Sequence, residues 1–170
     1  MKIHIIGPSG SGKSYLAQKL SRQYSVPAWS LDDLFWDNNG YSGKRAPAER
    51  DAMLEKILRE EQWIIEGVQH SWVGSVFEDA DVIVLLEPPA LLCRIRIIRR
   101  FLHRKMSHHA RENVDVKSLI SLLKWTKKFY RVNLPEIKAE LKPYSGKTVC
   151  MTRKRDIDTF CRKLKEGEAV

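Results

Sequence analysis

The run GPSGSGKS at residues 7–14 constrains this chain more than any other stretch. It fits the spacing G-x-x-x-x-G-K-[ST], in which glycines let successive backbone N–H groups wrap a phosphate. A β-branched run at residues 2–6 precedes it, and Leu16, Ala17, Leu20 and Tyr24 follow it at helical spacing. Strand, glycine-rich loop and helix in this order predict a site for the phosphates of a nucleotide at the positive end of a helix.

The motif predicts a role for its last two residues in particular. Lys13 would bring a positive charge to the β- and γ-phosphates, and the Ser14 hydroxyl would ligate Mg²⁺. The expected cofactors are therefore ATP and Mg²⁺. Nucleotide binding is assigned to the motif and to the residue after it: Gly7, Pro8, Ser9, Gly10, Ser11, Gly12, Lys13, Ser14 and Tyr15.

The size and composition of the chain favour a single domain. Its 170 residues suit one hydrophobic core. No apolar run reaches the roughly 18 residues of a membrane span, and the N-terminus lacks the regions of a signal peptide. We therefore expect a cytoplasmic protein without a membrane partner. Cys93, Cys150 and Cys161 form no C-x-x-C pair, which predicts reduced, mostly buried thiols.

The net charge is +9, from 30 Lys and Arg against 21 Asp and Glu. Such a balance suits either nucleic acid or nucleotides, since both are polyanions. Much of the excess lies between residues 94 and 131, as expected of a site that faces phosphate.

Carboxylates follow two of the other predicted strands. Residues 26–31 lead into Asp32 and Asp33, and residues 63–65 lead into Glu66 and Gly67. Because the carboxyl ends of parallel strands share one edge of a sheet, these groups would lie near the phosphates. Either aspartate could instead cap a helix. His70, in the loop that follows, either contacts a ligand or is an ordinary surface or core histidine.

Two basic residues precede a predicted helix at residues 46–60. Lys44 and Arg45 lie in the loop of residues 37–45 and either clamp an anionic acceptor or form a solvated pair. Exposed charged side chains usually face solvent, so the solvated pair and the anion clamp both stay open.

The fourth predicted strand, residues 81–86, leads into a helix after Pro88 and Pro89. Its arginines either face solvent or reach phosphate from the ligand edge of the sheet. Residues 103–115 are expected to form an irregular excursion. The predicted apolar face of the helix consists of Leu91, Leu92, Ile95, Ile98 and Leu102.

The last third of the chain predicts two helices, a fifth strand and a final helix. Residues 116–130 form a basic amphipathic helix that packs on the sheet or contacts a membrane or nucleic acid. A helix near residues 134–141 and a strand at residues 147–152 follow. Arg153 would lie at the ligand edge, where a base could stack. Asp156 would cap the last helix, whose apolar face is Ile157, Phe160, Cys161 and Leu164.

The whole pattern resembles the small P-loop kinases of the adenylate kinase type. Residues 7–14, 31–36, 63–68 and 77–81 also resemble the bacterial DNA topology modulation proteins, which share that fold. This resemblance implies an α/β fold with three layers, α/β/α, around a five-stranded parallel sheet in the order 2-3-1-4-5. It also implies one kinase-like domain over residues 1–170, with an acceptor-binding segment at about 33–61 and a lid at about 100–116.

The resemblance also implies roles for particular residues. Glu66-Gly67 matches the Asp-Gly whose carboxylate holds Mg²⁺ through water in adenylate kinases. Arg99 and Arg100 match the arginine pair that opens the lid and engages the nucleotide phosphates. Asp32 resembles the acid that orients or deprotonates the acceptor hydroxyl. His70 stands where adenylate kinases have the arginine that grips the nucleoside monophosphate, which weakens the case for AMP as the acceptor.

The predicted function is transfer of the γ-phosphate of ATP to an unidentified acceptor, which is a nucleoside, a nucleoside monophosphate or another small metabolite. The alternatives are an ATP-binding, nucleic-acid-associated regulator without kinase turnover, for which DNA is the partner, and a plain NTPase. The predicted catalytic residues are Lys13, Asp32, Arg99 and Arg100, and Ser14 and Glu66 hold the metal. Arg153 joins the nucleotide site, and the substrate side consists of Asp33, Arg45, Glu66, Gly67 and His70.

Overall fold

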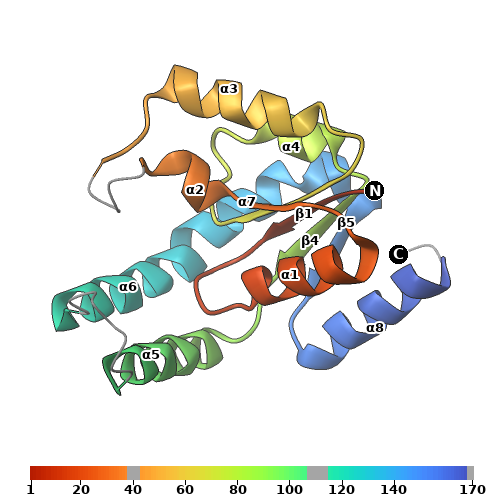
Figure 1. Ribbon diagram of the computed structural model, residues 1–170. Coiled ribbons are helices and arrows are strands. Elements are labelled where there is room, and N and C mark those ends of the chain that lie inside the picture. Colours follow the sequence, from red (N-terminus) through yellow and green to blue (C-terminus); the bar gives the residue numbers. More distant parts are fainter. Residues whose placement is uncertain (38–42, 107–114, 168–170) are drawn as a thin grey trace.

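The computed structural model describes residues 1–37, 43–106 and 115–167. Strands and helices alternate along most of the chain (Figure 1). In order, the elements are β1 Lys2–Ile6, α1 Lys13–Tyr24, β2 Ala28–Ser30, α2 Leu31–Phe35, α3 Pro47–Leu58, β3 Trp63–Gly67, α4 Gly74–Asp79, β4 Val82–Leu86, α5 Ala90–Met106, α6 Val116–Lys128, the π-helical turn η1 Phe129–Asn133, α7 Leu134–Glu140, the 3₁₀ segment η2 Lys142–Lys147, β5 Thr148–Met151 and α8 Lys154–Glu166.

The sheet confirms the predicted fold class. Its five strands are parallel and follow the order β2-β3-β1-β4-β5. The last residue of β1, Ile6, pairs with Gly67 on β3 and with Leu85 on β4. The glycine-rich loop of residues 7–14, called the P-loop from here on, follows Ile6 and therefore leaves the middle of the sheet at the edge where β3 and β4 also end.

Helices cover both faces of the sheet, because successive side chains on each strand point to opposite sides. On one face, Ile3 and Ile5 of β1 pack with Leu16 and Leu20 of α1 and with Phe160 of α8. The other face buries a second cluster against α2, α3, α4, α7 and η1 (Figure 1). This second cluster includes Ile6, Leu34, Leu54, Trp63, Ile65, Phe77, Phe129 and Ile137. The result is the predicted three-layer α/β/α arrangement.

The packing of α5 differs from the prediction. The side chains expected to be buried are exposed: Leu91, Leu92, Ile95, Ile98 and Leu102. Instead Cys93 and Ile97, on the other side of the helix, are buried. The reason is that α5 packs with this narrow side against the P-loop, where Gly10 lies next to the Cys93 backbone.

Several boundaries also differ from the prediction. Residues 103–106 are the last turn of α5, not an irregular excursion, while residues 107–114, which include His108 and His109, lie outside the described residues. Helix α4 was not predicted. Asp156 caps α8 as predicted, although it lies inside the first turn and not before it: its carboxylate accepts hydrogen bonds from the backbone N–H groups of Thr152 and of the N-cap residue Arg153. Cys150 is exposed, whereas Cys93 and Cys161 are buried.

None of the helices in the described part of the chain combines the length and the apolar character that crossing a membrane requires.

Candidate functional site

The glycines of the P-loop allow a path that other residues would obstruct. Gly10 has a φ of +78°, and a Cβ on it would lie 2.8 Å from the Cys93 carbonyl oxygen. Gly12, directly before α1, has a φ of +100°. These left-handed conformations are costly for residues with a side chain. The Ser11 hydroxyl is buried without a protein hydrogen-bond partner among the described atoms, which leaves a polar group free for a ligand.

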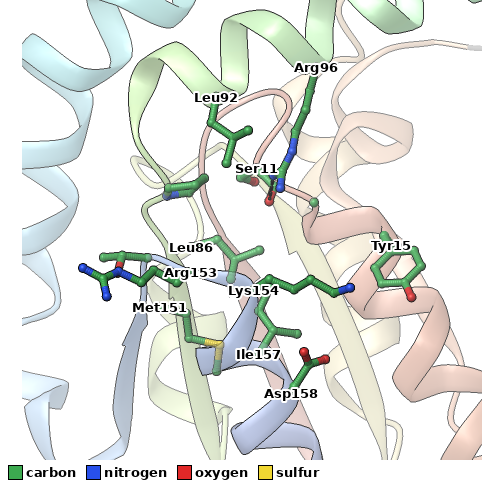
Figure 2. Close-up of a pocket in the computed structure, with 13 residues that line it drawn as sticks. Ser11, Tyr15, Leu86, Leu92, Arg96, Met151, Arg153, Lys154, Ile157 and Asp158 are labelled. Atoms are coloured by element: carbon green, nitrogen blue, oxygen red, sulfur yellow. Dashed lines mark hydrogen bonds between the residues drawn. The ribbon is translucent and has the colours of Figure 1, made fainter.

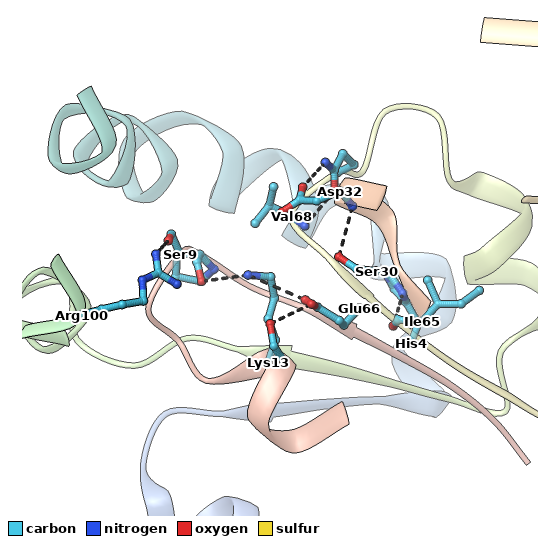
Figure 3. A network of polar contacts seen from close by, with 12 residues as sticks. His4, Ser9, Lys13, Ser30, Asp32, Ile65, Glu66, Val68 and Arg100 are labelled. Atoms are coloured by element: carbon cyan, nitrogen blue, oxygen red, sulfur yellow. Dashed lines mark hydrogen bonds and ion pairs between the residues drawn. The ribbon is translucent and has the colours of Figure 1, made fainter. Parts of the chain in front are cut away.

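Lys13, Ser14 and Glu66 form a polar cluster at the start of α1 (Figure 3). Ser14 Oγ donates to Glu66 Oε1 at 2.8 Å, and Lys13 Nζ lies 3.9 Å from Glu66 Oε2. Lys13 Nζ also donates to the Pro8 carbonyl at 3.5 Å. The end of β3 thus places a carboxylate directly beside the first turn of α1.

Burial shapes the electrostatics of this cluster. Lys13 and Glu66 are both buried. Removal from water lowers the pKa of the Lys13 ammonium, and the Glu66 carboxylate opposes that shift. An additional negative group would be attracted strongly to the Lys13 ammonium, because the low local dielectric strengthens the electrostatic interaction.

Of the two aspartates after β2, Asp32 is the one that lines the main cavity. Its Oδ1 accepts a hydrogen bond of 2.7 Å from Gln69 Nε2, and its backbone N–H donates to the Ser30 hydroxyl at 3.3 Å. Ser30 is therefore the N-cap of α2. Asp33 is exposed and is not among the described residues that line this cavity.

Two arginines on α5 contact the P-loop. Arg96 Nη1 donates to the carbonyl oxygens of Gly10 and Ser11, each at 3.1 Å, and Arg100 Nη2 donates to Ser9 Oγ at 3.5 Å. These residues lie four apart, so they share one face of the helix. Arg99 is exposed and, within the described part of the chain, is not among the residues that line the cavity.

The main cavity connects the P-loop to α2, α5 and α6 and has a volume of about 1040 Å³. Its floor holds Lys13, Ser14, Asp32 and Glu66. Its walls add two tryptophans and further cations. The wall residues include Trp36, Arg96, Arg100, Arg104, Lys117, Ser118, Ser121 and Trp125.

A second, more apolar cavity of about 380 Å³ opens beside Ser11 and Gly12, between the P-loop and the start of α8 (Figure 2). Leu86, Met151 and Ile157 line it, and Arg96 points from α5 toward Ser11. Tyr15 lines both cavities. Arg153 also lines the second cavity, at the side opposite Tyr15.

The remaining predicted substrate residues have structural partners. Arg45 donates to the carbonyl oxygens of Leu34 and Trp36 and pairs with Glu49, so its guanidinium fixes the chain after α2. His70 Nδ1 lies 2.9 Å from Glu140 on α7. Neither residue is among the described residues that line the main cavity.

Gly67 also has a packing role. A Cβ there would lie 2.7 Å from Leu31, so this glycine lets α2 approach β3 closely.

The sequence did not single out Arg96 among the arginines of its helix, and it assigned no site role to Gln69 or to the two cavity tryptophans, Trp36 and Trp125. The signal for Arg96 was present, because its spacing of four from Arg100 puts both guanidinium groups on one helix face. Gln69 had no comparable signal, since its contact with Asp32 depends on how the loop after β3 turns.

The donor set at Ser14 and Glu66 fits Mg²⁺. A hydroxyl and a carboxylate oxygen 2.8 Å apart are the hard oxygen ligands that this ion prefers. Few protein ligands are needed, because Mg²⁺ usually keeps several waters and takes the rest of its ligands from phosphates.

The P-loop between β1 and α1, the parallel sheet in this strand order and the cleft above its edge define a P-loop kinase-like fold. Solved structures agree. Shikimate kinase from Acinetobacter baumannii, in complex with shikimate, aligns with a TM-score of 0.59 and 13% identity over 97% of this chain and 92% of that one. Shikimate kinase from Aquifex aeolicus aligns with a TM-score of 0.51 and 16% identity over 98% of both chains. Shikimate kinase from Bacteroides thetaiotaomicron gives a TM-score of 0.52 and 16% identity over 96% of both.

Similarity in sequence is more limited. An uncharacterized protein of Bacillus subtilis (strain 168), YqaC, is 32% identical over 111 residues, which are 65% of this chain. The chain spans 60% of the length of that relative. No protein-family profile matches the chain. The resemblance to DNA topology modulation proteins stays a prediction, and the structural likeness establishes the fold.

Proposed function

We propose that this protein is an ATP-dependent phosphotransferase that phosphorylates a hydroxyl group of a small acceptor. One observation carries the proposal: a single cavity contains the P-loop lysine, the Ser14–Glu66 pair and Asp32. A plain phosphate-binding site needs only the first two. Asp32 adds a possible proton acceptor, and Trp36 and Trp125 add room and contact surface for a second molecule.

The donor side follows from the P-loop. The loop amides and Lys13 would hold the triphosphate, and Ser14 and Glu66 would hold Mg²⁺. The ion would supply positive charge to offset the charge on the transferred phosphate. The smaller cavity, with Leu86, Met151 and Ile157, takes the base, and Tyr15 and Arg153 border it.

The acceptor side is centred on Asp32. Its carboxylate orients the acceptor hydroxyl and takes its proton while the hydroxyl oxygen bonds to the γ-phosphorus. The bond from that phosphorus to the β–γ bridging oxygen breaks, and ADP leaves. Gln69 holds Asp32 in place through its 2.7 Å hydrogen bond. The acceptor-binding segment at about 33–61 and a lid at about 100–116 remain part of this proposal.

Arg96 and Arg100 act on the transferred group. They lie on the cavity wall beside the P-loop and can neutralise negative charge there. Arg104 and Lys117 lie in the same cavity, so the acceptor side is also cationic. Arg99 stays a candidate because it belongs to the arginine pair that the resemblance implies, although it is not among the described residues that line this cavity. Asp33, Arg45 and His70 stay substrate-side candidates on the sequence alone.

The decisive experiment is an acceptor screen with ATP labelled in its γ-phosphate. The panel should contain nucleosides, nucleoside monophosphates and hydroxylated acids, shikimate among them, with the Lys13→Ala variant as the blank. The proposal expects label to move to one class of acceptor with the wild-type protein and to none with the blank. Release of inorganic phosphate alone, unchanged by any acceptor, would indicate a plain NTPase.

The nucleic-acid regulator is tested separately by measuring DNA affinity against salt concentration. A steep loss with salt and no sequence preference would mean attraction to phosphate only. Sequence-dependent binding without any phosphoryl transfer would favour the regulator over the kinase.

A further inference from the structure

Helix α5 presents a continuous apolar stripe to solvent. Five side chains form it, at positions i, i+4, i+7, i+11 and i+15, which share one face of a helix. They are Leu91, Ile95, Ile98, Leu102 and Met106, with exposed fractions of 66, 44, 38, 50 and 80%. Single exposed apolar residues are common, but a contiguous row along one helix usually marks an interaction surface. We call this row the α5 stripe.

The α5 stripe cannot face the protein interior while the opposite face of α5 keeps its contacts with the P-loop. Its opposite face carries the buried residues Cys93 and Ile97 and the two arginines that contact the P-loop, Arg96 and Arg100. Helix α6 lies beside α5, and both project together from the edge of the sheet (Figure 1). The stripe is therefore held outward by contacts that belong to the nucleotide site.

The charge of α5 restricts what can cover the stripe. The helix contains five arginines and one lysine and has neither Asp nor Glu. At 100° per residue, Arg94 and Lys105 border the stripe on one side and Arg99 on the other. A second copy of α5 would bring two cationic rims together, which is unfavourable. The counterpart must combine an apolar interior with negative charge.

An anionic lipid surface fits these requirements better than a protein groove or a nucleic acid. Four of the five stripe residues are Leu or Ile and none is aromatic, whereas the centres of protein interfaces are enriched in aromatic residues. Nucleic acid offers no apolar layer for five aliphatic side chains. An amphipathic helix with a basic border lies flat in the interface of an anionic bilayer, and the 17 residues of α5 span about 25 Å for such contact.

We propose that the α5 stripe docks this protein on anionic lipid surfaces, with Arg94, Arg99 and Lys105 at the level of the lipid phosphates. This docking proposal does not rest on the proposed function, and it differs from the sequence-based expectation of no membrane partner.

The test is co-sedimentation of the full chain with lipid vesicles. Vesicles of phosphatidylcholine alone are compared with vesicles that also contain phosphatidylglycerol. The wild-type protein should sediment with the second kind only. Ile98→Ser and Leu102→Ser should each weaken that binding roughly tenfold, because each removes a large aliphatic side chain from the stripe. Val132→Ser, a change at an apolar residue that is 42% exposed on η1, should bind like wild type.

Further measurements separate the electrostatic contribution to vesicle binding from the apolar one, and distinguish both from a loss of the folded structure. Arg94→Gln/Lys105→Gln should weaken binding and reduce its dependence on salt. Circular dichroism melting curves and binding of a fluorescent ATP analogue show whether each variant retains its fold. Wild-type binding that survives at high salt gives evidence for the apolar component even if a serine variant fails to fold.

Three results would overturn the proposal. The first is failure of the wild-type protein to bind the anionic vesicles. The second is binding that the serine variants leave unchanged and that high salt abolishes, which would mean attraction by charge alone. The third is a dimer, detected by light scattering, that the serine variants dissociate while vesicle binding is absent; the stripe would then join two copies of the chain.

Discussion

Ser14 and Glu66, which are 52 residues apart in the sequence, are joined by a hydrogen bond of 2.8 Å. The other Glu66 oxygen faces the Lys13 ammonium at 3.9 Å. Both carboxylate oxygens thus interact with the two polar residues that end the P-loop motif. A ligand that takes the Ser14 hydroxyl must share it with Glu66 or displace Glu66, so the charge of this one carboxylate should govern how the site responds to a cation.

The first prediction concerns that carboxylate. Glu66→Gln should abolish most of the gain in ATP affinity that Mg²⁺ provides, because a neutral amide is a poor ligand for a hard cation. Without Mg²⁺ the variant should bind ATP at least as well as wild type, since a negative charge near the phosphates is gone. Titration of a fluorescent ATP analogue with and without Mg²⁺ measures both effects. Glu61→Gln, at an exposed position, is the control; an equal Mg²⁺ effect in all three proteins would contradict the prediction.

The second prediction concerns the buried lysine. Lys13→Ala should weaken ATP binding by roughly 10- to 100-fold, the range expected for loss of a charged hydrogen bond of about 1.5–3 kcal/mol. Because burial lowers the pKa of Lys13, wild-type affinity should also fall at alkaline pH before an ordinary lysine would deprotonate.

Lys19→Ala, at a half-buried lysine of the same helix that is not among the described residues lining the main cavity, should retain both the affinity and its pH profile. Isothermal titration calorimetry at neutral and alkaline pH measures these quantities. Equal loss in the two variants would mean that helix α1, not the Lys13 charge, is responsible.

The third prediction separates the arginines of α5. Arg96→Gln and Arg100→Gln should each lower the transfer rate by about 10²-fold or more, because arginines that stabilise a transferring phosphate contribute on the order of 10³–10⁵ in rate. Arg99→Gln should lower the transfer rate by less than about threefold, because Arg99 is exposed and is not among the described residues that line the main cavity. Single-turnover transfer from labelled ATP is the measurement. A larger loss at Arg99 than at Arg96 would favour the pair that the sequence resemblance implies.

The fourth prediction distinguishes the adjacent aspartates. Asp32→Asn should lower kcat by roughly 10²–10⁴-fold, the range for loss of a general base, and leave ATP affinity within a factor of a few. Asp33→Asn should change neither value appreciably. Gln69→Leu should lower kcat by less than Asp32→Asn does, because it frees the carboxylate without removing it. Equal activity of the Asp32 and Asp33 variants would exclude Asp32 as the base.

The fifth prediction concerns stability. His4 is completely buried in β1, its Nδ1 lies 3.1 Å from the Ile65 carbonyl, and its Nε2 has no protein partner among the described atoms. Burial lowers its pKa from 6.5 to about 4, although the hydrogen bond to Ile65 opposes the shift. Between these two values the unfolded chain binds more protons than the folded one. Stability should therefore rise with pH across this interval, by about 3 kcal/mol in all from this group.

Urea unfolding at pH 4.5 and pH 7 tests this assignment. In His4→Leu, which cannot titrate, the difference in unfolding free energy between the two pH values should shrink by most of that amount. His70→Gln leaves His4 in place and should retain the part of the difference in unfolding free energy that His4 contributes. If His4→Leu and wild type lose equal stability on acidification, carboxylates elsewhere account for the acid sensitivity.

The sequence predicted the sheet and the P-loop because both depend on local patterns. Apolar runs such as residues 82–86 can only be buried strands in this context, and the glycine spacing of residues 7–14 has one well-known geometry. Asp32 and Glu66 could be placed near the loop because parallel strands end at one edge.

The orientation of α5 could not be predicted in the same way. The sequence offers two candidate inner faces, a wide one with Leu91 and Ile95 and a narrow one with Cys93 and Ile97, and hydrophobicity alone favours the wide one. The narrow face is chosen by a tertiary contact, the close approach of Gly10 to the Cys93 carbonyl. Arg45 and His70 illustrate the same limit, because their partners come from the loop and helix geometry around them.

The contact between Gly10 and Cys93 also governs how the arm formed by α5 and α6 can move. Tyr130 donates a hydrogen bond to the Pro88 carbonyl and lies 3.4 Å from Cys93 Sγ, so the first turn of α5 is held from a second direction. The base of the arm is therefore fixed relative to the P-loop. We therefore expect any motion of the arm to be smallest at Arg96, beside this anchored base, and larger at Arg104 and Lys117, which lie farther along the arm and line the main cavity.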